Sequence, residues 1–455
     1  MIIRFIVENL FSFGERREFN LLPSPRYSRL SHHKYSLNSF DFLKLSVFYG
    51  ANGSGKSNLI KSIAYLKDIV LEEEIPPRFQ QHKFKFHNEL KEVEVLLGIE
   101  FISEGTPFIY ALKFNEGIIL HEELYISGLG VKDDVLIFER ETNQDGYIST
   151  KFSEDFEKDT ESKILQKVIE KNLSKPDRPL LKLLSTLDSP FLEDLGKAYR
   201  WFERTIQIIT PLSKPAALAQ RIDTNENFRE YANDTMCAFH TGIKNIKTEK
   251  KSLVEFFGQD NIGELDELIK ELDDSSKKMI GLPTRMGEEI LLVKEGSEVF
   301  VKRLRLEHQG LNNKTAFFYI NEESDGTVRL LDYIPAFQDI VSKEKVYIVD
   351  EIERSIHPLL IKELISKFSN DSNTKGQLIF STHESNLLDQ EIFRQDEIWF
   401  VEKDKNGSTD LYPLSEFKEH HTKNIRKGYL NGRYGGIPFL SNLQDLNWNK
   451  YAIAE

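Results

Sequence analysis

Apolar and polar positions alternate over roughly the first 20 residues and again between about residues 93 and 140, as they do in strands with one buried face. Turn residues interrupt both stretches, among them Gly14. The pattern predicts two short N-terminal strands and, further along, an antiparallel meander. Between them, residues 44–50 form a short apolar run and residues 57–70 are amphipathic at helical spacing. A buried strand, a glycine-rich loop and a helix are therefore expected in succession.

In the middle of the chain, apolar residues recur every three or four positions, and several prolines divide the pattern into short helices. Strand signals return near residues 289–306. Two apolar strands, VYIV and QLIF, then flank one amphipathic helix, an alternation typical of parallel α/β structure. We therefore predict a mixed α/β fold in three parts: an N-terminal lobe (1–150), an inserted α-helical domain (151–285) and a C-terminal lobe (286–455).

Composition narrows the class of protein. Charged residues make up 29% of the chain, and no run of about 18 apolar residues offers a membrane-spanning helix. The N-terminus has no cationic segment ahead of its apolar residues, so it does not resemble a signal peptide. Cys237 is the single cysteine, which excludes an intrachain disulfide. These features favour a protein of the reducing cytoplasm without membrane contact.

The net charge of −13 argues against a general attraction to nucleic acid. Two local stretches are nevertheless basic, at residues 244–251 and 418–433. The ordinary interpretation of each stretch is a solvated helix face. The overall charge thus does not indicate nucleic acid as a partner. It does not exclude a local basic groove that binds nucleic acid.

The segment between the predicted strand and helix, GANGSGKS, has the pattern GxxxxGK[ST] of a phosphate-binding loop. Glycines let the backbone wrap closely around phosphate, and the N–H groups of the loop and of the following helix turn toward the anion. We expect Lys56 to reach the β- and γ-phosphates of ATP and Ser57 to ligate Mg²⁺. The predicted nucleotide-binding residues of this loop are Gly50, Asn52, Gly53, Ser54, Gly55, Lys56 and Ser57.

The second motif, VYIVDE, places two carboxylates at the end of an apolar strand. Adjacent carboxylates at a buried strand end are costly without a cation, so the pattern favours a metal site of the Walker B kind. We expect Asp350 to hold Mg²⁺ through water and Glu351 to polarise the attacking water.

Two further motifs gain meaning from their spacing. His383 follows the apolar strand QLIFS, about thirty residues and one helix beyond the Walker B motif. A lone histidine after a strand is more often structural, but in a sheet with neighbouring strands this one would lie near the γ-phosphate. The segment ESDGT is by itself a polar turn that opens a helix, and it lies about 25 residues before the Walker B motif.

These four motifs, in this order, resemble those of the ABC-type ATPase heads of the SMC and RecF-like group. The resemblance covers both ends of the chain and leaves the helical insertion between them. SDGT matches the signature motif, ERSIHP the D-loop and His383 the switch histidine. The segments ENLFSFGE, ESDGT, DEIERSIHP, FSTHES and IRKGYLNGRYGGIP are closer still to AAA15-type, abortive-infection ATPases of bacterial defence loci.

The resemblance implies an ATPase that uses Mg²⁺ and binds ATP between two heads. The P-loop, Walker B and His383 of one subunit would face Ser324 and Gly326 of the other, which makes a homodimer the minimal unit and allows higher homo-oligomers. ATP then shifts an open–closed equilibrium by its differential affinity for the two states. The catalytic residues so implied are Lys56, Glu351 and His383.

Two positions depart from the ABC-type pattern. Asp325 stands where an SGGQ signature has a small residue, which predicts slow hydrolysis or dependence on a partner. No glutamine has a secure place as the Q-loop residue, and Gln80, Gln81 and Gln144 are weak candidates.

Three functions compete. The first is the sensor or regulatory subunit of an anti-phage system, with a phage protein as trigger and a nuclease-like effector encoded nearby. The second is an SMC/RecF-like repair or chromosome-maintenance ATPase that binds DNA directly, against which the acidic charge and the missing long coiled coil argue. The third is a fused TOPRIM-type nuclease that uses Glu402 and Asp404. Only about 50 residues follow them, without a DxD pair, so a hairpin edge is the preferred interpretation.

Overall fold

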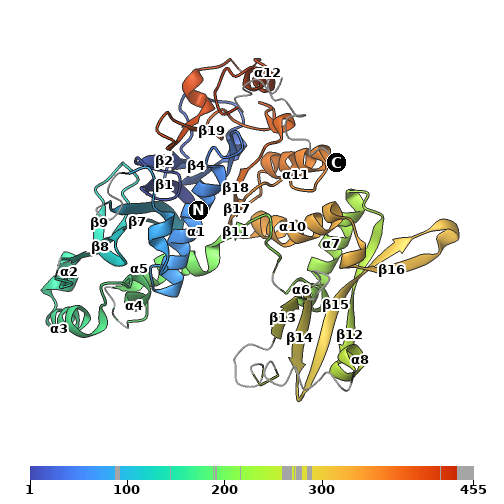
Figure 1. The fold of residues 1–455 in the computed structure, drawn as a ribbon, viewed down its shortest axis with the longest axis horizontal. Helices are drawn as coiled ribbons and strands as arrows, with labels where there is room; N and C mark the ends of the chain where they lie inside the picture. The colour runs from blue at the N-terminus through green and yellow to red at the C-terminus, as the bar shows by residue number, and fades with distance from the viewer. Residues whose placement is uncertain are drawn as a thin grey trace, which may run out of the picture. The chain divides into compact units, whose positions relative to one another are not determined.

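The computed structural model of the protein describes residues 1–87, 93–143, 145–187, 189, 192–215, 217–258, 269–270, 272, 279–283, 289–420 and 422–437 (Figure 1). The chain forms two compact units. Unit 1 comprises Met1–Ile208, Glu344–Ile352 and Ile365–Glu455, and unit 2 comprises Ile209–Lys343 and Glu353–Leu364. Each unit therefore draws on segments that are far apart in the sequence.

One sheet of unit 1 is antiparallel throughout, in the order β10-β9-β8-β7-β6-β1-β2. Alternate residues of β7 are buried from Phe108 to Phe114, as the apolar periodicity requires. The predicted N-terminal strands and the predicted meander are confirmed. The strands are β1 (Ile2–Glu8), β2 (Arg17–Asn20), β6 (Val95–Ser103), β7 (Thr106–Asn115), β8 (Ile118–Ile126), β9 (Val135–Thr142) and β10 (Ile148–Phe152).

The second sheet of unit 1 has the order β11-β17-β18-β5-β19-β20, and its four central strands are parallel. Every residue of β5 and β17 is buried, which explains why these segments are continuously apolar. Because β5 lies between two strands from the C-terminal part of the chain, both ends of the sequence build one sheet. The strands are β5 (Leu45–Tyr49), β11 (Ile206–Ile209), β17 (Val346–Val349), β18 (Gln377–Ser381), β19 (Ile398–Lys403) and β20 (Thr409–Pro413).

The predicted helix after the glycine-rich loop is α1 (Lys56–Glu72), whose apolar face is buried. One hydrophobic core takes in this face together with residues of both sheets. No helix among the described residues combines the length and the apolar character needed to cross a membrane. The other elements of unit 1 are β3 (Lys34–Leu37), β4 (Phe40–Leu43), α2 (Glu154–Lys158), α3 (Thr160–Val168), α4 (Leu181–Ser185), α5 (Glu193–Arg200) and α12 (Ile425–Leu430).

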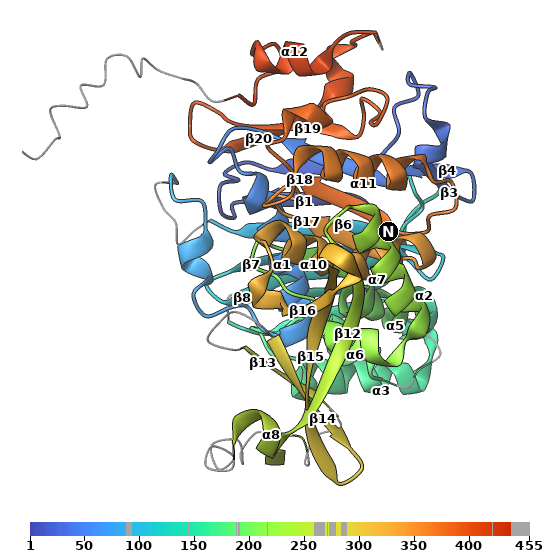
Figure 2. The ribbon, with the colours of Figure 1, turned by 90° about the vertical axis from the view of Figure 1, so that its right-hand side faces the viewer.

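Unit 2 contains an antiparallel sheet in the order β12-β15-β14-β13, with β16 paired to β15 (Figure 2). The predicted hairpin near residues 289–306 is its β14–β15 pair. The helix α11 (Pro358–Asn370) starts in unit 2 and ends in unit 1. The other elements are α6 (Leu218–Thr224), α7 (Glu226–Ala238), β12 (Ile243–Ser252), α8 (Leu253–Phe257), β13 (Met279–Pro283), β14 (Glu289–Glu295), β15 (Glu298–Gln309), β16 (Thr315–Tyr319) and α10 (Asp325–Ser342).

The secondary structure of residues 151–285 is only partly helical, whereas a helical domain was predicted. It contains the helices α2 to α8 but also the strands β11, β12 and β13. The basic stretch 244–251, interpreted as a helix face, lies on β12. Its few apolar residues gave no period-two signal, and the strand is specified by pairing with β15, as where Glu249 lies opposite Arg303. The predicted domain boundaries stay a prediction. The chain first passes from unit 1 to unit 2 between Ile208 and Ile209.

Candidate functional site

Three of the predicted motifs reach the same edge of the six-stranded sheet. The strands β5, β17 and β18 are parallel neighbours, so the segments that follow them emerge together. The glycine-rich loop follows β5, the two carboxylates follow β17, and His383 lies just after β18. A cavity of about 290 Å³ opens there, and its lining residues are Asn52, Gly53, Ser54, Gly55, Lys56, Ser57, Asn58, Glu351 and His383.

The loop is shaped to cradle an anion. Gly55 has φ 120°, and a Cβ at this position would lie 2.2 Å from Thr409 Oγ1, so a glycine is required. The helix α1 begins at Lys56, which leaves its first N–H groups without partners inside the helix. The Lys56 side chain is buried, and its ammonium group donates to the carbonyl oxygens of Gly50 at 2.8 Å and Ala51 at 3.2 Å.

The candidate metal ligands face one another. Ser57 Oγ donates to Asp350 Oδ1 at 3.1 Å, and Ser381 Oγ donates to the same oxygen at 2.5 Å. Asp350 is only 7% exposed. A buried carboxylate beside a hydroxyl offers the oxygen donors that Mg²⁺ prefers, so these residues fit the metal that the phosphate-binding loop implies.

Glu351 holds an unusual backbone conformation next to this pair. Its φ is 52°, in the left-handed region that costs a residue with a side chain. The Glu351 N–H group donates to Ser381 Oγ at 2.8 Å, which fixes the turn. Strain of this kind persists where the surroundings impose it, and it occurs often at active sites. Glu351 thereby lines the cavity together with the exposed His383.

The cavity thus brings together most of the residues predicted from the first three motifs. Gly50 does not line it but accepts a hydrogen bond from Lys56, and Asp350 is tied to it through Ser57. The roles of all these residues in binding and catalysis remain predictions.

The predicted signature residues lie in unit 2. Ser324 caps the N-terminus of α10, where its hydroxyl accepts the N–H of Thr327 at 3.2 Å. Gly326 packs so closely on the ERSIHP segment that a Cβ would lie 2.5 Å from the carbonyl oxygen of Ser355. The signature and the D-loop segment are therefore in direct contact within unit 2. Their predicted role opposite the P-loop of another subunit stays a prediction.

Three residues that support the site were not predicted from the sequence. Ser381 joins Asp350 to the Glu351 backbone, as described above. Thr409 Oγ1 donates to the carbonyl oxygen of Ser54 at 2.8 Å and lies within hydrogen-bond distance of Ser12 Oγ, at 2.7 Å. Ser12 Oγ also accepts from Asn58 Nδ2 at 2.8 Å. Ser12 and Ser381 belong to recognisable segments, ENLFSFGE and FSTHES, but Thr409 has no signal of its own in the sequence.

The three glutamines considered for the Q-loop position differ in where they lie. Gln81 borders a second cavity of about 310 Å³, which shares Asn58 with the first. Gln80 is an exposed residue, and Gln144 lies outside the described residues. Gln81 is therefore the candidate that borders a cavity next to α1, and its role as the Q-loop residue stays a prediction.

Glu402 and Asp404 lie in the β19–β20 hairpin, as the preferred interpretation expected. The Glu402 carboxylate accepts the N–H of Gly436 at 3.1 Å. Asp404 Oδ1 accepts the N–H groups of Asn406 and Ser408, both at 2.8 Å, and so holds the turn. Both carboxylates thus have a structural explanation.

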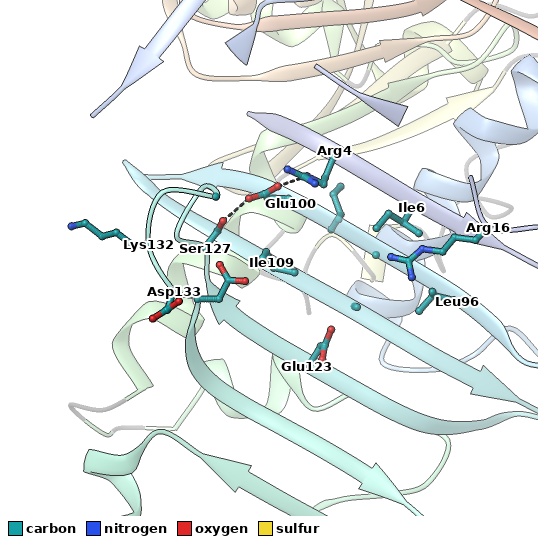
Figure 3. A pocket seen from close by; sticks show the side chains of 15 residues that line it. Arg4, Ile6, Arg16, Leu96, Glu100, Ile109, Glu123, Ser127, Lys132 and Asp133 are labelled. Carbon is teal, nitrogen blue, oxygen red and sulfur yellow. Dashed lines mark hydrogen bonds and ion pairs between the residues drawn. The ribbon is translucent and has the colours of Figure 1, made fainter. Parts of the chain in front are cut away.

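A larger cavity of about 610 Å³ lies on the antiparallel sheet, as Figure 3 shows. Its wall includes Arg4, whose Nε lies 2.6 Å from Glu100 Oε2, and Ser127, whose hydroxyl also donates to Glu100. None of the residues predicted for nucleotide binding lines this cavity. Size alone therefore does not locate the phosphate-binding chemistry.

A phosphate-binding loop, Glu351 and His383 around one cavity, with Asp350 bonded to Ser57 of that loop, define a P-loop nucleotide-binding head. A family model described as "AAA domain, putative AbiEii toxin, Type IV TA system" matches residues 45–389, about three quarters of the chain. The chain belongs to this family. The resemblance to abortive-infection ATPases is confirmed at the level of this family.

A comparison with curated proteins finds no match. Among solved structures, the chain is similar to an SMC head bound to the C-terminal winged-helix domain of ScpA, with 14% identity, 92% of this chain and 99% of that chain covered, and a TM-score of 0.42. It is also similar to the SMC head domain from Thermotoga maritima, with 12% identity, 90% and 98% coverage, and a TM-score of 0.39.

Proposed function

We propose that this protein binds ATP with Mg²⁺ at the 290 Å³ cavity and hydrolyses it. The observation that carries the proposal is the convergence of the phosphate-binding loop, Glu351 and His383 on one cavity. Family membership supports it, because an AAA domain is a nucleotide-binding domain. The second cavity, which shares Asn58, offers room for the nucleoside next to the phosphates.

Each residue has a distinct role in this proposal. The loop N–H groups and Lys56 bind the phosphates and neutralise their charge. Ser57 and Asp350 hold Mg²⁺, which when bound supplies further charge neutralisation at the β- and γ-phosphates. Glu351 orients the attacking water and accepts its proton, and His383 donates a hydrogen bond to the γ-phosphate.

We further propose that hydrolysis requires a homodimer or a higher homo-oligomer. Ser324 and Gly326 belong to unit 2, at the start of α10, where a helix N-terminus favours an anion. In the closed pair, this N-terminus of one subunit would meet the γ-phosphate bound by the other. ATP then links the two subunits, and hydrolysis releases them.

Replacement of Asp325 by asparagine is expected to strengthen ATP-driven assembly about tenfold. Asp325 is the first residue of α10, so its carboxylate would lie beside the γ-phosphate of the partner and repel it. Relief of repulsion between two like charges about 4 Å apart is worth between about 1 kcal/mol in bulk water and about 4 kcal/mol near a protein surface, and about 1.4 kcal/mol already corresponds to a factor of ten. The ATP concentration that gives half-maximal dimer, measured by analytical ultracentrifugation, reports the change.

Asp325→Glu is the matched control, because it keeps the charge and should assemble like wild type. If Asp325→Asn requires as much ATP as wild type, the carboxylate does not face phosphate and the proposed signature contact is wrong.

At the level of the cell, we propose that the ATPase is the sensor or regulatory subunit of a bacterial anti-phage system. The family description, with its toxin and toxin–antitoxin class, and the abortive-infection segments support this role. A phage protein would act as the trigger, and a nuclease-like effector encoded nearby would be held or released according to the nucleotide state.

The test is a phage challenge of cells that carry the gene with its neighbours, in wild-type form and with Lys56→Ala. We expect protection with the wild type and its loss with the variant, together with a co-purifying effector. Equal plaque counts with and without the wild-type gene across a phage panel, and no stable protein partner, would overturn the defence role while leaving the ATPase proposal intact.

A further inference from the structure

The sheet of unit 2 has one covered face and one face that carries charged and aromatic side chains. The helices α6 and α7 lie against the covered face, where Thr248 Oγ1 donates to the carbonyl oxygen of Ala219 and Lys302 Nζ lies 2.6 Å from Asp223 Oδ2. Side chains alternate along a strand, so the odd-numbered residues between 247 and 251 of β12 and between 303 and 307 of β15 lie on the opposite face. Val301, further along β15 on that face, is buried in a hydrophobic cluster. We call this opposite face the ladder face; its members on β12, β15 and β16 are Lys247, Glu249, Lys251, Arg303, Arg305, Glu307, Phe317 and Tyr319.

Cations and aromatic rings alternate across the ladder face and the adjoining α8. Lys247, Arg303 and Arg305 each lie over one or two rings, which orders these long basic side chains. The distances from cation to ring centre are 5.1 Å (Arg303 and Phe256), 3.7 Å (Arg303 and Tyr319), 5.6 Å (Arg305 and Tyr319), 4.7 Å (Arg305 and Phe317) and 5.0 Å (Lys247 and Phe317). Much of this array stays accessible, since Phe317 is 37% exposed and the side chain of Lys247 is 53% exposed.

The ladder face carries more positive than negative charge, although the chain as a whole has a net charge of −13. Lys247 Nζ lies 2.8 Å from Glu307 Oε2, and Arg303 Nε lies 2.6 Å from Glu249 Oε2. Arg305 Nη1 approaches the same Glu249 at 3.3 Å. The face thus has two glutamates as ion-pair partners for four basic residues, so its net charge is positive.

We propose that the ladder face binds single-stranded nucleic acid. Surplus cations beside extended strands offer sites for successive phosphates, and the exposed ring faces and guanidinium planes offer surfaces on which unpaired bases stack. An acidic protein would match the charge but leave the rings without stacking partners. A duplex keeps its bases stacked inside and would likewise not use the rings. This binding site lies in unit 2 and does not rest on the proposed ATP chemistry of unit 1.

The test is fluorescence anisotropy of a labelled, 20-nucleotide oligo(dT) with the full chain, across a series of salt concentrations. The double variant Lys247→Gln/Arg305→Gln removes two expected phosphate contacts. We expect it to bind at least tenfold more weakly and to lower the slope of log K against log salt by about 1.4, because each contact with a single strand contributes about 0.7. Phe317→Ala should weaken binding about tenfold with an unchanged salt slope, because it removes a stacking surface but no charged group.

The matched control is Lys250→Gln/Lys343→Gln, which makes the same charge change on the other face of β12 and just after the C-terminus of α10. It should bind like wild type, and thermal unfolding should show that every variant is folded. Equal weakening by the control double variant would mean that only the overall charge matters, which overturns the proposal. Competition by polyglutamate as strong as that by unlabelled oligo(dT) would assign the face to an acidic protein and also overturn it.

Discussion

Glu351→Gln is expected to bind ATP like wild type and to hydrolyse it at least about a hundredfold more slowly. General-base catalysis typically contributes a factor of about 10²–10⁴, and an amide cannot accept the proton that the attacking water loses. The exchange preserves the size of the side chain, and the turn is held by the Glu351 backbone N–H, which donates to Ser381 Oγ at 2.8 Å. The backbone at φ 52° therefore needs no rearrangement.

The same variant should remain in the ATP-bound oligomer, because the step that releases the subunits is blocked. Steady-state turnover and size measured in one preparation with Mg²⁺ and ATP separate the two effects. Glu363→Gln, the same exchange at an exposed position of α11, should turn over ATP at the wild-type rate. Wild-type turnover by Glu351→Gln would show that another group activates the water, and the mechanism built on the strand-end carboxylates would fail.

The sequence predicts this site well because the chemistry itself imposes the pattern. The loop must contain glycines, as the 2.2 Å approach of a Gly55 Cβ to Thr409 shows, and the carboxylates must end an apolar strand to reach a metal. The parallel strands are likewise recognisable, because burial on both faces requires the unbroken apolar runs of β5 and β17.

What the sequence does not reveal depends on contacts between distant residues. Thr409 supports Ser54 from 355 positions away, and nothing near Thr409 marks it for that role. The strand β12 was missed for a related reason. Only Ile243 and Ile246 of its residues are fully buried, so its strand character comes from pairing with β15 and from cross-strand charges. A strand that is specified by contacts with distant residues shows no apolar periodicity in its own sequence.

Lys56→Ala is expected to weaken ATP binding by at least about a hundredfold and to abolish ATP-driven assembly. A hydrogen bond to a charged group contributes about 1.5–3 kcal/mol, and Lys56 is placed to make more than one such bond with the β- and γ-phosphates. Each 1.4 kcal/mol is a factor of ten in affinity. Titration of a fluorescent ATP analogue measures the loss directly, independently of turnover.

The Lys56 ammonium also supports the loop, because it donates to the carbonyl oxygens of Gly50 and Ala51. Lys56→Met and Lys56→Ala both remove these two hydrogen bonds together with the charge, but methionine keeps most of the apolar stem, so the pair separates the ammonium group from the packing of the stem. If charge on phosphate is the main contribution, methionine and alanine weaken binding equally, while Lys61→Ala, an exposed position of the same helix, binds like wild type. Binding by Lys56→Met within about threefold of wild type would instead mean that only the packing of the side-chain stem matters, and the phosphates would need another cation.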